Sequence, residues 1–133
     1  MMWLPDTNVW IKLINPEYSP VKQRFHRCHP QQLILCDVVK SELYYGAYKS
    51  QRPIANVALI DELCLQFPSL SFDEKSAKIL GQIRVELAKK GLLIGAYDMQ
   101  IAAIAMAHQC VLVTHNVREF SRIESLLIED WES

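Results

Sequence analysis

The sequence predicts an α/β fold, a three-layer α/β/α sandwich with a mainly parallel central sheet, for three reasons. Short apolar runs alternate with longer segments of helical spacing, which is the pattern of strand and crossover-helix units. More residues fall in the helical segments than in the strand-like ones. The chain has 133 residues, of which 50% are hydrophobic and 22% charged, as in ordinary globular proteins with one substantial core. We therefore expect a single domain over residues 1–133.

Five short apolar runs are the expected strands. Pro5 should limit the first of them, because proline has no N–H to donate to a sheet. Runs this short between turn-forming residues are typical of buried strands. The expected strands are residues 2–4, 33–36, 70–72, 111–113 and 126–128.

Six segments carry helical spacing or composition, and several have recognisable ends. Asp37 and Asp73 are expected N-caps, Pro53 suits a first helical position, and Gly91 after two lysines suits a helix end. The last segment is apolar nearly all round, so its helix should be central and buried. The expected helices are residues 7–14, 20–28, 38–49, 53–66, 74–90 and 97–108.

Charge and composition exclude several classes of protein. The net charge of −1 and the pI of about 6.4 produce no global positive field, so any RNA contact must be local. The four cysteines form no CxxC pair and are expected to be small buried hydrophobes in a reducing cytosol. No apolar run is long enough to span a bilayer and no secretory signal is present, so we expect a soluble, cytoplasmic protein.

Four acidic residues border apolar segments where the predicted fold would bring them together. Asp6 follows the first strand, Glu42 lies in an otherwise apolar helix stripe, Asp98 opens the buried helix, and Glu119 follows the strand 111–113. Carboxylates placed together repel one another and lose hydration, so they need a compensating cation. Oxygen ligands suit magnesium or manganese. The sequence therefore predicts a metal-dependent enzyme.

Polar neighbours of these acids could hold waters or orient the ligands. They are Thr7, Asn8, Thr114 and Asn116. Structural alternatives remain at each acid. Asp6 or Asn8 could simply cap the next helix, Asp98 could complement a helix dipole, and Asn116 with Glu119 could form a capping box.

Gly46 lies one helical turn after Glu42. Glycine costs roughly 1 kcal/mol in helix propensity relative to alanine, so another backbone or a ligand is expected to approach closely there. The alternative is that Glu42 is solvated and Gly46 is incidental.

Other conspicuous groups favour less specific roles. His26, Cys28 and His29 resemble part of a zinc site but lack a spaced fourth ligand, so a surface cluster is expected. Ser41 and Ser76 have no histidine that the sequence pairs with them, and the glycines form no phosphate-binding loop. Nucleophilic catalysis and nucleotide binding are therefore disfavoured.

Four stretches of sequence carry a family resemblance, in order and covering essentially the whole chain. They are LPDTN at 4–8, SELYYG at 41–46, IGAYDMQIAA at 94–103 and LVTHNVREF at 112–120. Together they resemble the PIN-domain ribonucleases and, more narrowly, the VapC toxins. Asp6, Glu42 and Asp98 match the three core acids of that family, and Glu119 matches a more variable fourth. Asn116 stands where many relatives place an acid.

The resemblance implies a PIN-like α/β/α domain that cleaves RNA with Mg²⁺ or Mn²⁺ and is neutralised by a VapB-type antitoxin. It also implies a homodimer and a structured RNA substrate. Transfer RNA is the first expectation, with the anticodon loop of initiator tRNA as its finer form, and ribosomal RNA is the second. One or two ions held by the acids would activate water and stabilise charge at the scissile phosphate.

An acidic cluster repels phosphate, so the bound metal and nearby cations must reverse the local potential. The candidate substrate-binding cations are Lys12, Arg24, Lys49 and Arg52. Ordinary solvated charge is the alternative for each of them.

Two rival classes remain. One is a catalytically silent PIN-scaffold module that binds protein or RNA. The other is a phosphoacceptor receiver domain, which requires an early pair of adjacent acids and a lysine after its last strand. This chain has Pro5 before Asp6 and no such lysine, so the receiver class is disfavoured.

Overall fold

The computed structural model describes residues 1–17 and 19–132 and alternates strands with helices. In chain order the elements are β1 (Trp3–Pro5), α1 (Thr7–Ile14), α2 (Pro20–His26), the 3₁₀ helix η1 (Pro30–Gln32), β2 (Leu35–Cys36), α3 (Asp37–Tyr48), α4 (Pro53–Gln66), β3 (Ser69–Leu70), α5 (Glu74–Lys90), α6 (Ala96–Ala107), β4 (Val111–Val113), α7 (Val117–Phe120) and β5 (Ile128–Glu129). This order confirms the predicted α/β class.

The strands pair only in parallel. β1, β4 and β5 form one sheet in the order β1-β4-β5, and β2 pairs with β3 in a second. A bridge between Trp3 and Leu33 joins the two, and the N–H of Ile34 donates to the carbonyl oxygen of Trp3 at 2.9 Å. Because Pro5 is in register with Val113, β1 and β4 end side by side. The loops that follow both strands therefore start at the same edge.

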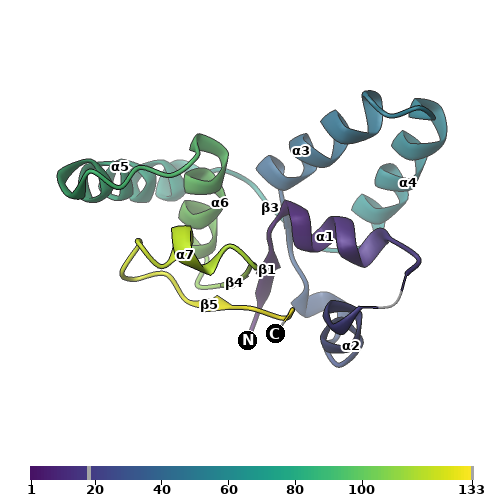
Figure 1. The fold of residues 1–133 in the computed structure, drawn as a ribbon, viewed down its shortest axis with the longest axis horizontal. Coiled ribbons are helices and arrows are strands. Elements are labelled where there is room, and N and C mark those ends of the chain that lie inside the picture. The colour runs from purple at the N-terminus through teal and green to yellow at the C-terminus, as the bar shows by residue number, and fades with distance from the viewer. Residues whose placement is uncertain (18, 133) are drawn as a thin grey trace.

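Helices flank this sheet and divide into two groups. α3 and α4 pack as a pair at one end of the molecule, with α1 next to α3, while α5 packs against α6 at the other end (Figure 1). Helix α6 also contacts β4, and residues 101–105 within it are completely buried. The predicted central, buried helix is confirmed, since its small alanines allow close approach of the neighbouring elements.

Three of the predicted helix ends are confirmed. The carboxylate of Asp73 accepts from the N–H of Ser76 at 2.9 Å and caps α5. Pro53 is the first residue of α4. Gly91 ends α5 with φ +65°, the left-handed conformation that glycine adopts without steric cost.

The prediction that Asp37 caps the third helix is wrong. Helix α3 already includes Asp37, and its N-cap is Cys36, which makes no side-chain capping bond. The Asp37 carboxylate instead accepts from the N–H of Phe72 at 3.3 Å. It therefore ties the start of α3 to the segment after β3, a long-range contact that the local sequence does not reveal.

Strand and helix boundaries shift by small amounts. β1 includes Pro5 rather than stopping before it. β2 is only the last two residues of its expected run, and β3 and β5 are two-residue strands displaced from theirs. Helix α2 ends earlier than expected, at His26. Neither η1 nor α7 was expected as a helix. Short elements such as these depend on tertiary contacts more than on local preference.

The cysteines are all free, and Cys36 and Cys110 are buried as predicted, whereas Cys28 and Cys64 are half-buried. Among residues 1–17 and 19–132, no group of three ligand residues close enough to hold a metal ion includes His26, Cys28 or His29. His29 instead caps η1. Within the described part of the chain, no helix is both long and apolar enough to traverse a lipid bilayer.

Candidate active site

Asp6 lies at the edge where β1 and β4 end. Its N–H donates to the carbonyl oxygen of Val113 at 2.9 Å, which fixes its backbone to the neighbouring strand. Its Oδ1 accepts from the N–H of Val9 at 3.0 Å, so Asp6 also caps α1. The structural alternative is thus confirmed, but a carboxylate offers two oxygens, and the cap uses only part of this capacity.

The environment of Asp6 disfavours its negative charge. Burial is the largest influence and raises the pKa of this carboxyl above its ordinary value, and the charge of Glu42 adds to the effect. Hydrogen bonds from Thr114 and Val9 act in the opposite direction, and Lys12 contributes a smaller lowering. A buried acid whose pKa is raised by burial and by a second acid is typical of a site that binds a cation.

Glu42 projects from α3 toward α1. The hydroxyl of Thr7, at the start of α1, donates to Oε1 of Glu42 at 2.7 Å. Glu42 is half-buried and close enough to both Asp6 and Asp98 to raise their pKa values. It therefore belongs to the same cluster, and the alternative of a simply solvated Glu42 is wrong.

Asp98 lies in the first turn of α6 and carries the clearest sign of crowded charge. Desolvation by burial is the main cause that raises its pKa to about 6, and the charges of Glu42, Asp6 and Glu119 raise it further. A carboxylate that only complemented a helix dipole would be stabilised in its charged form. The shift is in the other direction, so burial and the neighbouring acids together outweigh the dipole.

Glu119 lies in the short helix α7 and joins the cluster through Asp98. The amide nitrogen of Asn116 donates to its Oε2 at 3.0 Å. The N–H of Asn116 donates to the hydroxyl of the buried Thr114 at 3.0 Å. Because no side-chain oxygen of Asn116 accepts from the backbone of α7, the capping-box alternative is wrong. Asn116 instead orients Glu119.

The structure thus brings all four predicted acids together without a partner cation. Of the ion pairs formed within the described chain, none includes Asp6, Glu42, Asp98 or Glu119. No three of them bring oxygens within 4.8 Å of one another. An anionic, oxygen-only donor set of this spacing fits a hard divalent ion that keeps several of its waters.

The four predicted substrate-binding cations lie in different places. Lys12 lines a pocket of about 410 Å³ together with Asp6 and the exposed Asn8. Arg24 pairs with Glu129 at 3.0 Å and lies 5.6 Å above the ring of Trp131.

The other two predicted cations lie at the turn between α3 and α4. Lys49 stacks 4.7 Å from the ring of Tyr45, and Arg52 is exposed immediately before α4. Among the four, only Lys12 therefore borders the pocket that contains an acid of the cluster.

Gly46 opens an apolar groove between α1, α3 and α4. Apart from its chain neighbours and the nearby backbone of α3 itself, no atom of the described chain lies within 4 Å of the position that a Cβ would take, so no other backbone approaches it. Gly46 lines a groove of about 530 Å³ together with Ile11, Leu43 and Leu59, and Glu42 stands on the same wall. The groove therefore leads to the acid cluster.

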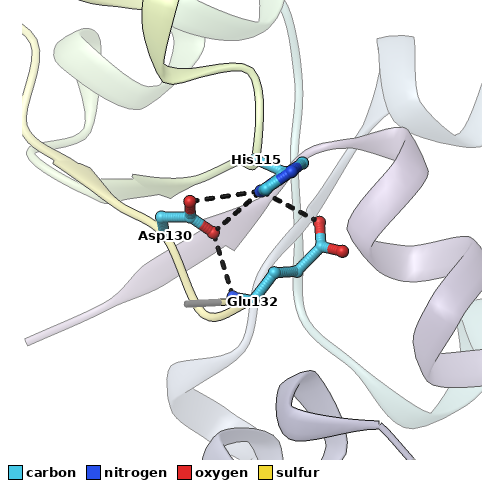
Figure 2. Close-up of side chains that lie close together, drawn as sticks. All are labelled: His115, Asp130 and Glu132. Atoms are coloured by element: carbon cyan, nitrogen blue, oxygen red, sulfur yellow. Dashed lines mark hydrogen bonds and ion pairs between the residues drawn. The ribbon is translucent and has the colours of Figure 1, made fainter.

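A second polar cluster, which the sequence did not indicate, adjoins the Asp6 pocket. His115 follows β4, and Asp130 and Glu132 follow β5; their ligand-type atoms lie within 4.8 Å of one another (Figure 2). The rule that polar residues gather beyond the ends of parallel strands would have found these residues, had it been applied to β5 as it was to β1 and β4.

Comparison with known proteins identifies the family of the chain. The sequence matches the PIN domain profile over residues 3–126. The chain is 37% identical over 131 residues to the tRNA(fMet)-specific endonuclease VapC of Shigella flexneri, with 98% of each chain covered. It is 35% identical over 131 residues to the ribonuclease VapC2 of Haemophilus influenzae, again with 98% of each covered. Among solved structures, it matches the DNA-bound VapBC of Salmonella typhimurium with a TM-score of 0.91, at 37% identity and 98% coverage of each chain.

Proposed function

The chain belongs to the VapC ribonuclease toxins of the PIN-domain family, and on this premise we propose that it cleaves transfer RNA with Mg²⁺ or Mn²⁺ bound at the acid cluster. The observation that carries the proposal is the meeting of four carboxylates, one from the residue after β1 and the others from α3, α6 and α7, none of which forms an ion pair within the described chain. Burial in this cluster, together with the charges of the other acids, raises the pKa of Asp98 to about 6.

Asp6, Glu42 and Asp98 would hold the ion, with Glu119 as a peripheral ligand directly or through water. A divalent ion in this place supplies Lewis-acid activation of water and neutralises charge at the scissile phosphate. Magnesium and manganese both accept oxygen ligands and retain waters, which suits the wide spacing of these acids.

The remaining polar residues position the acids. Thr7 donates to one oxygen of Glu42 and leaves Oε2 without a hydrogen bond from the described residues. Thr114 donates to Asp6, and Asn116 donates to Glu119, so three of the four carboxylates are oriented by neutral donors. Orientation by neutral groups keeps the full negative charge of the cluster for a cation.

Transfer RNA is the proposed substrate because the relative from Shigella flexneri is named for tRNA(fMet) and matches this chain over nearly its whole length. The finer proposal is the anticodon loop of initiator tRNA, and ribosomal RNA is the second candidate. Unpaired loop nucleotides suit a shallow acidic site, since their scissile phosphates are accessible without unwinding a helix.

We also propose that a VapB-type antitoxin neutralises the enzyme by binding the groove between α1, α3 and α4. Relatives of known structure are VapBC complexes. The groove presents the exposed Ile11 and Leu59 and has Glu42 on its wall. An amphipathic antitoxin segment could bury these apolar side chains and extend a cationic residue to the acids. We further propose that two copies of the chain, each a single PIN-like domain, form a homodimer.

The decisive experiment compares wild type with Asp98→Asn. Purified proteins are incubated with total cellular RNA and Mg²⁺ or Mn²⁺, and the cut ends are mapped by sequencing. We expect discrete cuts in tRNA with wild type and none with the variant, while both show the same circular dichroism. If wild type leaves RNA intact with every divalent ion, the silent-module alternative is correct. If both proteins cleave equally, the acid assignment is wrong.

A further inference from the structure

The C-terminal segment places a carboxylate of its own in the pocket beside Asp6. That pocket is lined by Asp6, Lys12, His115 and Glu132 among others. Lys12 Nζ donates to Oε1 of Glu132, and His115 Nδ1 lies 3.6 Å from Oε2 of the same carboxylate. One oxygen of Glu132 therefore accepts from Lys12 of α1, and the other lies at ion-pair distance from His115, whose Nδ1 is hydrogen-bonded to Asp130 at 3.2 Å (Figure 2).

Lys12 makes this cluster a poor site for a second metal ion. His115, Asp130 and Glu132 have the spacing of a metal site, but Lys12 already donates to Glu132. An ammonium group at one of three ligands opposes a further cation. Asp130 lies 3.2 Å from the same His115 nitrogen, so Nδ1 acts as the donor to the carboxylates around it.

Glu132 is not needed to hold the C-terminal segment in place. Trp131 is buried and packs against Trp3 with ring centroids 6.3 Å apart. Glu129 adds an ion pair to Arg24 at 3.0 Å and accepts from the indole of Trp3 at 3.2 Å. Hydrophobic burial and these bonds anchor the segment, so the position of Glu132 between two donors calls for another explanation.

We propose that Lys12 and His115 form a phosphate subsite for the RNA, next to the scissile position, and that Glu132 competes with the phosphate for the Lys12 ammonium and for the place beside the His115 ring. This inference rests on the proposed ribonuclease function. A backbone phosphate presents two anionic oxygens, as a carboxylate does, and takes the same nitrogen donors. Because Asp6 lines the same pocket, a phosphate held there lies beside the acid cluster. Glu132 therefore lowers the affinity for RNA, because a phosphate must displace its carboxylate before it binds.

The test measures RNA binding in the Asp98→Asn background, so that the probe, fluorescein-labelled tRNA(fMet), stays intact. Lys12→Met and His115→Gln should each weaken binding by about tenfold, as expected for one lost phosphate contact. Glu132→Gln should strengthen it by about threefold to tenfold. The control is Glu124→Gln, which removes the same charge from an exposed pair with Lys90, at 3.3 Å, and should leave affinity unchanged.

A double-variant cycle separates competition from general charge. The gain in RNA affinity from Glu132→Gln should disappear when Lys12 is already methionine, because the two residues share one site. A gain that persists there, or that Glu124→Gln reproduces, would mean that only net charge matters and overturns the subsite. Weaker binding by Glu132→Gln also overturns it. Thermal melting of each variant shows that folding is retained.

Failure of the proposed function gives a different result. If wild type does not cleave RNA with metal, the nuclease assignment fails, whatever the subsite variants do. A titration with inorganic phosphate, followed through the His115 imidazole signals in NMR, then tests the anion site alone. Saturation at lower phosphate in Glu132→Gln than in wild type supports the site, and identical titrations refute it.

Discussion

Replacement of Asp98 by asparagine should stabilise the metal-free protein while it abolishes cleavage. Burial, with the charges of the neighbouring acids adding to it, raises the pKa of Asp98 from 3.8 to about 6, and this shift corresponds to about 3 kcal/mol at most, at about 1.4 kcal/mol per unit. Asp98 is half-buried, so solvent screening reduces the gain to about 1–2 kcal/mol. Loss of the favourable helix-dipole contact subtracts a few tenths of a kcal/mol, roughly.

The sign of the pH dependence follows from the direction of the shift. The pKa of Asp98 is higher in the folded than in the unfolded chain, so its penalty is absent below an ordinary carboxyl pKa. The penalty grows as the pH rises from 3.8 toward about 6 and is complete above it. The advantage of Asp98→Asn should therefore be greatest at neutral pH and fade in acid.

Urea denaturation in the presence of EDTA, at neutral pH and in mild acid, measures this effect. The matched control is Glu74→Gln, which also removes a carboxylate from the first turn of a helix, but an exposed one outside the cluster. Glu74→Gln should lower the free energy of unfolding slightly or leave it unchanged. Added Mg²⁺ should stabilise wild type more than Asp98→Asn. If Asp98→Asn destabilises the metal-free protein at neutral pH, the acids do not repel one another as inferred.

Three further predictions test the positioning of the acids, the groove and the backbone. Thr7→Val removes the donor to Glu42, so the metal concentration for half-maximal cleavage should rise about tenfold, as titration of the cleavage rate would show. Gly46→Phe fills the groove, so calorimetry should show antitoxin affinity reduced by about tenfold or more, with cleavage retained. Gly91→Ala should destabilise by about 1 kcal/mol because its φ is +65°, whereas Gly81→Ala, inside α5, should stabilise by about 0.5–1 kcal/mol in urea denaturation.

Each of these has a contrary outcome. An unchanged metal requirement in Thr7→Val would show that Glu42 needs no orientation. Undiminished antitoxin binding by Gly46→Phe would place the antitoxin elsewhere. A stabilising Gly91→Ala would mean that the end of α5 relaxes from the left-handed conformation.

Local patterns in the chain determined the fold class and the location of the acids. Apolar runs and helical spacing depend on residues within one or two turns, and so do the cap at Asp73 and the helix end at Gly91. The positions of Asp6 and Asp98 follow from the same patterns, because strand ends and helix starts mark the functional edge of a parallel sheet.

Only the tertiary structure decided which groups meet across long stretches of chain. Asp37 bonds to the segment after β3 instead of capping α3, and Glu132 reaches Lys12 from 120 residues away in sequence. The C-terminal segment takes this position because Trp131 packs against Trp3 in the folded protein. Contacts of this kind arise from the packing of whole elements, and no periodicity or capping rule in a single sequence specifies which distant charges that packing will pair.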